Sequence, residues 1–324
     1  MNRKDDHIQY ALAQPAINND FDKVRFTHHA FPETNLEDID LTTTLFNRTF
    51  PYPFYINAMT GGSDQAGKLN LRFAKLAKHF QIPMATGSIT AAIKDPSLLK
   101  TFSVIRDVYP EGFVIANIGA GHPVANAIKA IGLLKANALQ IHVNAVQEIV
   151  MPEGDKDFKG WLASIEAIRQ GIQVPLIVKE VGFGMSAKTF SQLTAIGVRY
   201  VDVAGKGGTN FSKIENNRRQ QTLPTFDDWG QSTVESLIAA KPFTNLQVIA
   251  SGGIRQPMDV IKSLVLGAKM VGLSGYFLHL ISNHTDEEAI ATITTFIEEL
   301  KFIMLLLGKP TIKALPTAEF TYTP

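Results

Sequence analysis

The chain has 324 residues, of which 45% are hydrophobic and 19% charged, and this composition indicates a globular protein with a sizeable core and excludes disordered and collagen-like classes. Its 31 Lys and Arg balance 30 Asp and Glu, so no net field favours nucleic acid or an anionic membrane. Because cysteine is absent, disulfides, thiolate nucleophiles and zinc–thiolate sites are excluded, which fits a reducing cytoplasm.

Neither the N-terminus nor the apolar runs predict export or membrane insertion. Residues Met1 to His7 are charged where a signal peptide needs an apolar run. The longest apolar candidate, Ser263 to Ile281, contains Lys269 and three glycines, whereas a membrane span needs about 20 predominantly apolar residues. We therefore expect a cytoplasmic protein with neither a membrane nor a nucleic-acid partner.

From residue 54 onward, short apolar runs rich in β-branched residues alternate with segments of helical spacing. We count eight such runs, at residues 54–58, 82–86, 113–118, 138–143, 174–179, 200–204, 247–251 and 269–273. Most starts lie 22 to 36 residues apart, the size of a strand–helix–strand unit with parallel strands. Eight units predict an α/β fold of the closed (β/α)8, or TIM-barrel, type rather than an open doubly wound sheet.

The residues that remain outside the eight units predict three additions to the barrel. Residues 1–50 form an N-terminal extension that contributes to the substrate site, and residues 51–285 form the barrel. Within it, residues 205–231 are an insertion after strand six, and their Gly, Asn and Arg content is typical of a mobile active-site lid. Residues 286–324 are expected to hold a last helix and a tail.

Reacting groups in (β/α)8 barrels lie at the carboxyl ends of the strands. Here those ends are polar or glycine-rich, at residues 57–62, 86–88, 117–119, 142–144, 179–180, 205–209, 251–253 and 274–275. Any single glycine fits ordinary turn chemistry. The pairs Gly252-Gly253 and Ser274-Gly275 follow strands seven and eight, where barrels commonly bind phosphate on backbone N–H groups, so we expect a phosphate-bearing cofactor or substrate.

Two groups of side chains at these ends point to charge chemistry. Lys179 would place a cation in the barrel mouth, where its partner is either a carboxylate such as Glu180 or an anionic ligand such as reduced flavin. After strand four, a cluster of neutral donors and one carboxylate suits a hydrated Mg²⁺ carried by a substrate phosphate, although a solvated loop glutamate is the alternative. This cluster consists of His142, Asn144, Gln147 and Glu148.

Gly182 to Ala187 matches the G-x-G-x-x-A dinucleotide-binding pattern, follows a predicted strand and has Asp202 downstream at the expected distance. Its context differs from that of a Rossmann fold, because it belongs to the fifth of eight similar units instead of opening a nucleotide-binding half. We therefore interpret it as a βα turn of the barrel.

Read together, these motifs resemble the FMN-dependent type 2 isopentenyl-diphosphate isomerases over nearly the whole chain. The matching stretches, whose order and spacing make the resemblance specific, lie at residues 3–7, 39–41, 57–62, 87–88, 94–96, 117–119, 140–148, 179–182, 207–211, 214–215, 218 and 251–255.

The resemblance implies FMN, Mg²⁺, reduction of the flavin by NADPH, and 1,3-allylic interconversion of isopentenyl and dimethylallyl diphosphate by a homotetramer or homooctamer. It implies FMN contacts from Ala58, Met59, Thr60, Ser88, Asn117, Lys179, Thr209, Gly252, Gly253, Ser274 and Gly275. Arg3 and Lys4 would bind the substrate diphosphate together with Gln147. His142, Asn144 and Gln147 are the candidate catalytic residues, and Glu148 would bind the metal.

With no cysteine acid available, we expect reduced FMN itself to move the proton, through one flavin atom such as N5, while Gln147 steers it. The nearest rival is an FMN-dependent 2-hydroxy-acid oxidase, which carries His before the paired glycines and Arg after them, where this chain has Lys206 and Thr209. Inosine-monophosphate dehydrogenase needs a cysteine. A non-enzymatic flavin-storage barrel would not explain Arg3, Lys4, Glu148 and the insertion together.

Overall fold

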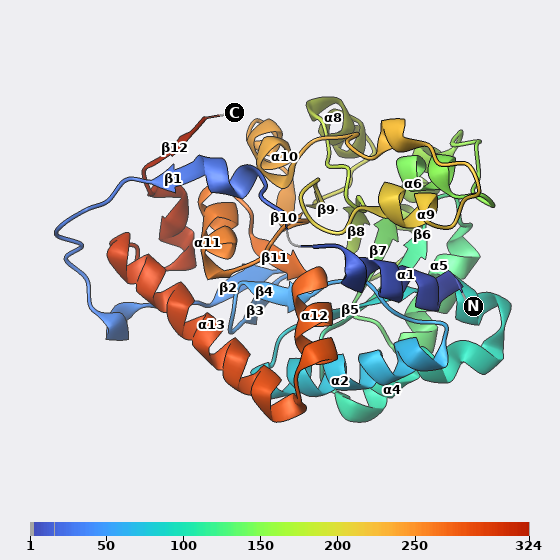
Figure 1. The fold of residues 1–324 in the computed structure, drawn as a ribbon, viewed down its shortest axis with the longest axis horizontal. Coiled ribbons are helices and arrows are strands. Elements are labelled where there is room, and N and C mark those ends of the chain that lie inside the picture. Colours follow the sequence, from blue (N-terminus) through green and yellow to red (C-terminus); the bar gives the residue numbers. More distant parts are fainter. Residues whose placement is uncertain (1–2, 16, 324) are drawn as a thin grey trace.

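Eight parallel strands close into a barrel in the computed structural model, which describes residues 3–15 and 17–323 (Figure 1). Around the barrel, neighbouring strands are β10 (Gln247–Ser251), β11 (Met270–Leu273), β4 (Phe54–Ile56), β5 (Met84–Ser88), β6 (Val114–Gly119), β7 (Ala138–His142), β8 (Leu176–Lys179) and β9 (Tyr200–Asp202). Each predicted run coincides with one of these strands to within a few residues, so the (β/α)8 fold is confirmed.

Helices surround the strands because each presents one apolar stripe to the barrel. On α2, for example, Phe73, Leu76 and Phe80 are buried, and the Ser63 hydroxyl caps the first turn by accepting from the Ala66 N–H. The helices between residues 64 and 306 are α2 (Asp64–Phe80), α3 (Thr90–Lys94), α4 (Lys100–Val108), α5 (Val124–Leu134), α6 (Ala145–Val150), α7 (Trp161–Gly171), α8 (Ala187–Ala195), α9 (Phe211–Asn216), α10 (Thr233–Ala240), α11 (Pro257–Val265), α12 (Gly275–Asn283) and α13 (Asp286–Leu306). Within the described ranges, no helix combines the length and apolar character that a membrane crossing needs.

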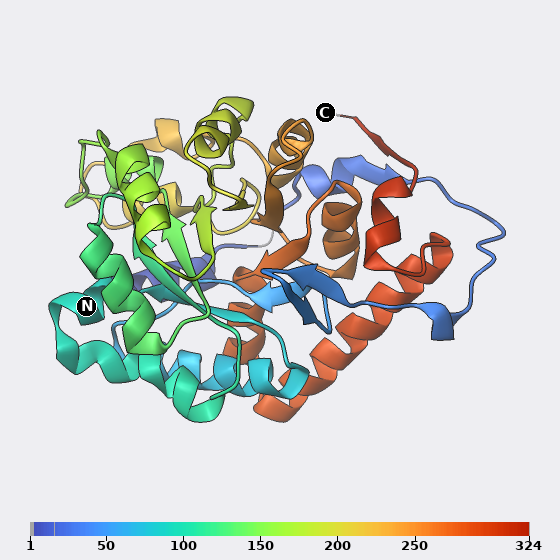
Figure 2. The same cartoon turned by 180° about the vertical axis from the view of Figure 1, so that it is seen from behind.

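A β-hairpin from the N-terminal segment packs into the amino-terminal end of the barrel (Figure 2). Its strands β2 (Thr43–Leu45) and β3 (Arg48–Phe50) pair antiparallel, and the two turn residues Phe46 and Asn47 both have positive φ, as a type I′ turn requires. The Phe46 ring lies 5.3 Å from that of Phe113 and 4.7 Å from that of Tyr200. The N-terminal segment therefore fills the barrel end opposite to the carboxyl ends of the strands.

The beginning of the chain lies over the other end. Helix α1 (Arg3–Ala13) lies beside α12 (Figure 1), and β1 (Val24–Phe26) pairs antiparallel with β12 (Phe320–Tyr322) near the C-terminus. Between α1 and β1, the Asn19 side chain donates to the carbonyls of Gly207 (3.2 Å) and Gly253 (2.9 Å), at the ends of two barrel strands. The Arg255 guanidinium also pairs with Asp22 at 2.6 Å. These contacts anchor the segment that carries α1.

The insertion at residues 205–231 folds around one carboxylate. Oδ1 of Asp227 accepts from the Ser212 hydroxyl and from the Asn216 amide, both at 2.8 Å, and the Asp227 carbonyl accepts from the Asn210 amide at 2.7 Å. Helix α9 and a short 3₁₀ turn at Pro224–Phe226 lie within it. The segment thus has internal structure of its own, and its action as a lid stays a prediction.

Candidate active site

A cavity of about 1190 Å³ opens at the carboxyl ends of the barrel strands. Residues at or just after the ends of all eight strands line it, and Arg3, Lys4 and His7 of α1 border it from above the strands. Because parallel strands end at the same rim, segments far apart in the sequence meet in this single space.

Every predicted site residue except Thr60 lines the cavity, although the individual roles stay predictions. The lining members of that set are Arg3, Lys4, Ala58, Met59, Ser88, Asn117, His142, Asn144, Gln147, Glu148, Lys179, Thr209, Gly252, Gly253, Ser274 and Gly275. Thr60 is buried beside the cavity, where its hydroxyl donates to Asn70 and its carbonyl accepts from the Gly87 N–H at 2.7 Å. Its side chain therefore supports the neighbouring loop.

The turns after β10 and β11 form a cradle in which three of the four residues, Gly252, Gly253 and Gly275, have no side chain. Gly252 and Gly253 both have positive φ, which glycine adopts most readily, and a Cβ at Gly208 would lie only 2.6 Å from the Gly253 nitrogen. Helix α12 begins at Gly275 without a side-chain cap among the described residues. Backbone N–H groups at such a turn and helix start suit a phosphate, so the residues present fit a phosphate-bearing group here.

Several basic residues line the same cavity, among them Arg3, Lys4 and Lys179. Burial, with the charge of Arg3 nearby, lowers the pKa of Lys4 to about 8, although Glu215 acts in the opposite direction. Nζ of Lys179 donates to the Glu180 carbonyl at 2.5 Å and not to the Glu180 carboxylate. The Glu180 pairing considered for Lys179 is therefore not the one observed, and the cationic surroundings favour an anionic ligand.

The Glu180 carboxylate turns away from Lys179 and into the glycine-rich loop that mimics a dinucleotide motif. Its Oε2 accepts from the N–H groups of Val181, Gly182 and Phe183 at 2.6, 2.9 and 2.7 Å. Burial raises the pKa of Glu180 to about 7, against these donors and the charge of Lys179. The N–H groups that would face a pyrophosphate in a Rossmann fold thus bind a carboxylate of the chain itself.

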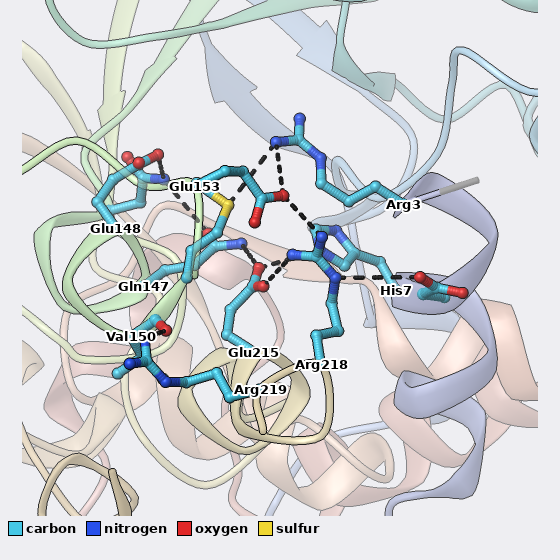
Figure 3. A network of polar contacts seen from close by, with 12 residues as sticks. Arg3, His7, Gln147, Glu148, Val150, Glu153, Glu215, Arg218 and Arg219 are labelled. Carbon is cyan, nitrogen blue, oxygen red and sulfur yellow. Dashed lines mark hydrogen bonds and ion pairs between the residues drawn. The ribbon is translucent and has the colours of Figure 1, made fainter. Parts of the chain in front are cut away.

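A buried carboxylate joins α1, α6 and α9 in one polar network (Figure 3). The Glu215 side chain is inaccessible to solvent and accepts from Nε2 of Gln147 at 2.8 Å and from Arg218 at 2.5 Å. His7 Nε2 lies 3.0 Å from the same carboxylate, and Arg218 also donates to Glu153 at 2.6 Å. Burial alone would raise the pKa of Glu215, but its contacts with His7, Gln147 and Arg218 hold it below its usual value.

Sequence reasoning did not assign a role to His7, Glu215 or Arg218, although the motif stretches included them. Two signals were available: their place in those stretches, and the presence of charged residues in an inserted segment and in the N-terminal extension. Their convergence depends on the packing of α9 against both α1 and α6.

The loop after β7 orients the candidate metal ligand. Nδ2 of Asn144 donates to Glu148 Oε1 at 2.8 Å and lies 3.3 Å from Gln147 Oε1, while the Asp155 N–H donates to Glu148 Oε2 at 2.9 Å. Among the described residues no group of three His, Cys, Asp or Glu side chains forms a cage for a cation. A single carboxylate of this kind suits Mg²⁺ only if a phosphate and water supply the other ligands.

The pKa of the His142 imidazole is unusually low. Burial first, and then the charges of Lys4 and Lys179, lower its pKa to about 3, so the ring is neutral near pH 7. A neutral imidazole has one N–H donor and one acceptor nitrogen, and the partner of each nitrogen decides its chemistry.

The sequence of this chain is similar to one protein-family model and to named proteins. A model of the family described as FMN-dependent dehydrogenase matches residues 125–321. The chain is 48% identical over 326 residues to an isopentenyl-diphosphate delta-isomerase of Latilactobacillus sakei subsp. sakei, covering 99% of this chain and 93% of that protein. It is 46% identical over 325 residues to the protein of the same name from Staphylococcus aureus, with the same coverage.

Solved structures share the fold at low sequence identity. A flavocytochrome b2 double mutant with pyruvate bound aligns with TM-score 0.73 and 19% identity, covering 97% of this chain and 81% of that chain. A mandelate oxidase mutant with 2-hydroxy-phenylacetamide aligns with TM-score 0.69 and 14% identity, covering 99% and 94%. At these identities the likeness extends to the barrel and not to the reaction.

Proposed function

The chain belongs to the FMN-dependent type 2 isopentenyl-diphosphate delta-isomerases, and from this premise we propose that it interconverts isopentenyl and dimethylallyl diphosphate by proton transfer that uses reduced FMN. One observation carries the proposal: the single rim cavity joins two sets of anion-binding groups, the glycine turns after β10 and β11 and the cations of α1. An enzyme that binds a phosphate-bearing cofactor beside a diphosphate substrate needs both sets.

The cradle at Gly252, Gly253, Ser274 and Gly275 would hold the FMN phosphate, with Thr209 beside it. The flavin ring would then lie against Ala58, Met59, Ser88 and Asn117, with Lys179 supplying positive charge to the reduced ring; these residues all line the cavity. Bound FMN would supply the acid/base atom for the allylic proton transfer, and NADPH the electrons that keep it reduced. Thr60 would support this site from outside the cavity.

Arg3 and Lys4 would bind the substrate diphosphate from α1. Arg3 lies 3.7 Å from Glu153, and Lys4 lines the cavity near Arg3 and Glu215, so both have charged neighbours that a diphosphate would join. Glu148 would take up a Mg²⁺ that arrives with the diphosphate, because two oxyanions bridged by a cation lose much of their mutual repulsion. With Arg3 and Lys4, the cation would hold the diphosphate in one position while a proton is transferred at the allylic carbons.

Gln147 would steer the substrate at the reacting carbons, and the geometry of its amide supports this role. With Nε2 donating to Glu215, its Oε1 faces Asn144, so the amide is held in one orientation. A neutral amide is a poor carbon acid or base, which is why we assign it orientation and leave the proton to the flavin. His142 and Asn144 complete the polar wall around it.

The site gives little support to the rival 2-hydroxy-acid oxidase activity. The position that the oxidases fill with a base holds Lys206, whose Nζ pairs with the exposed Asp228 at 2.9 Å in the insertion. Lys206 is not among the cavity-lining residues, so it offers no base to a hydroxyl group there.

The decisive experiment incubates the purified protein with FMN, NADPH, Mg²⁺ and isopentenyl diphosphate. We expect dimethylallyl diphosphate to accumulate without stoichiometric NADPH consumption. Conversion at the same rate with FMN held oxidised, or oxygen uptake with lactate or glycolate in place of the diphosphate, would overturn the proposal. We further propose a homotetramer or homooctamer in the cytoplasm, which light scattering and cell fractionation test.

A further inference from the structure

A row of polar side chains crosses the barrel interior beside the cavity. We call it the relay, and its members in order are Asp202 on β9, Asn57 after β4, Gln140 on β7, Asn117 on β6 and His142 at the end of β7. The first four are at most 3% exposed, so each of their polar atoms needs a partner inside the barrel. Their hydrogen bonds can therefore be followed donor by donor.

At one end of the relay, the hydrogen-bonding partners are groups that can only accept or only donate. The Asp202 carboxylate accepts from Asn57 Nδ2 at 2.8 Å, and it also accepts from the Tyr55 and Ser251 hydroxyls and the Ala204 N–H. On its other side, Asn57 Oδ1 accepts from the Ala58 N–H at 2.7 Å. A carboxylate only accepts and a backbone N–H only donates, so the Asn57 amide has one possible orientation.

The orientation of the Asn57 amide fixes the orientations of the next two amides, those of Gln140 and Asn117. Because Asn57 presents its oxygen, Gln140 must turn Nε2 toward it, at 3.3 Å, and its Oε1 then accepts from Asn117 Nδ2 at 2.9 Å. Asn117 is left with Oδ1 facing Nδ1 of His142, at 2.8 Å. Since an amide oxygen only accepts, the proton must sit on Nδ1 of the imidazole.

We propose that this relay holds His142 in the Nδ1–H tautomer, so that Nε2 presents a lone pair to the cavity, and that Gln140 is the positioning residue that transmits the orientation. Nε2 lies beside Gly119, where an added Cβ would come within 3.3 Å of it. Gln140 is fully buried and does not line the cavity, so its hydrogen bonds reach His142 only through Asn117.

The relay restricts what His142 can do with a ligand. As a neutral ring of this tautomer, Nε2 accepts a hydrogen bond from an N–H or O–H of whatever lies beside it, and it cannot donate to a phosphate oxygen without gaining a second proton. Within the proposed function, contacts to the diphosphate would then come from the cations of α1, and His142 would face a donor on the flavin or an ordered water. The tautomer itself does not depend on the proposed function.

A second cavity histidine supplies an internal reference. His122 lies between Asn126 Nδ2, 3.1 Å from its Nδ1, and Thr90 Oγ1, 3.1 Å from its Nε2. None of these partners belongs to the relay. A change at Gln140 should therefore alter His142 and leave His122 as it was.

The test is the ¹⁵N NMR spectrum of the FMN-bound protein labelled with ¹⁵N-histidine, with the His142 signals assigned by their loss in a His142→Gln variant. We expect a protonated, pyrrole-type Nδ1 and a bare, pyridine-type Nε2. A proton on Nε2 in this spectrum overturns the proposal. The readout needs no turnover, so it stays informative if the isomerase activity is absent.

Two matched variants test the relay itself. Gln140→Met keeps the shape but removes both hydrogen bonds, and the His142 Nδ1–H signal should lose about half or more of its intensity as the Asn117 amide divides between two orientations. Gln140→Glu should keep the original tautomer, because a carboxyl buried near Asp202 retains its proton, donates to Asn57 and accepts from Asn117. An unchanged His142 spectrum in the Gln140→Met variant refutes the relay.

Visible absorption of bound FMN and thermal melting establish that each variant is folded. If Gln140→Met does not fold, Asn117→Leu removes the acceptor of His142 directly. The proton should then move to Nε2, and its persistence on Nδ1 would equally refute the proposal.

Discussion

Nε2 of Gln147 donates to Oε1 of Glu215 over 2.8 Å, although the two residues lie 68 positions apart in the chain. This contact connects the loop after β7 with the insertion after β9, and it gives the Gln147 amide its orientation. The carboxylate is also held by Arg218 and lies against His7 of α1 (Figure 3). Glu215 thus connects the position of α1 over the cavity with the orientation of the Gln147 amide.

Glu215→Gln should lower kcat of the isomerase by roughly 10- to 100-fold, because a charged hydrogen bond in a buried setting contributes about 1.5–3 kcal/mol. Steady-state kinetics with isopentenyl diphosphate measure the effect. Glu298→Gln on the exposed face of α13 is the matched control and should keep the original rate. Equal rates for both variants would show that Glu215 does not orient the catalytic amide.

The affinity for the diphosphate should depend on the charge of Lys4. Since burial lowers the pKa of this ammonium to about 8, it carries a proton below that pH and loses it above. KM should therefore rise above pH 8, by roughly tenfold at full deprotonation if about 1.4 kcal/mol of attraction is lost. Kinetics across this pH range give the profile.

Lys4→Arg is the control for that profile, because a guanidinium stays protonated throughout the range. Its KM should be nearly independent of pH above 8, even if its absolute value differs. The same rise in this variant would assign the titration to another group.

Glu148→Gln should raise the Mg²⁺ concentration needed for half-maximal activity, because an amide oxygen is a weaker ligand for a divalent cation than a carboxylate. The rate at saturating Mg²⁺ should recover in part. Activity titrated against Mg²⁺ measures this shift, with Glu166→Gln on α7, a half-buried residue that does not line the cavity, as the control. Full activity of the Glu148 variant at limiting Mg²⁺ would remove the metal role.

Phe46→Ala should lower the stability of the fold and leave the FMN site intact. Phe46 stacks on Phe113 and packs against Tyr200 at the closed end of the barrel, and removing a buried ring of this size costs about 3–5 kcal/mol. Urea unfolding measures the loss in the free energy of unfolding. FMN affinity at a temperature where the variant is folded should be unchanged, because the cofactor residues line the opposite end; a weaker FMN affinity would contradict this separation.

The sequence alone determined the barrel and its functional rim. Eight apolar runs at βαβ spacing leave few arrangements other than a closed parallel barrel, and strands that run parallel bring their polar carboxyl ends together whatever the details of packing. For this reason Lys179, Asn117, His142 and the glycine turns could be predicted to meet in one cavity. The family resemblance implied an FMN contact for Thr60 as well, which stays a prediction. The structure adds that its side chain lies beside the cavity and donates to Asn70, a detail that hydrophobic spacing does not determine for a loop residue.

The tertiary structure decided which side chains contact one another, which the hydrophobic periodicity of the sequence does not indicate. The meeting of His7, Gln147 and Glu215, the occupation of the glycine-rich loop by the Glu180 carboxylate, and the donor order from Asp202 to His142 each depend on side chains from separate elements. Hydrophobic spacing reports only whether a position is buried. Which donor meets which acceptor is decided by angstrom-scale distances between elements, and those exist only once the barrel has closed.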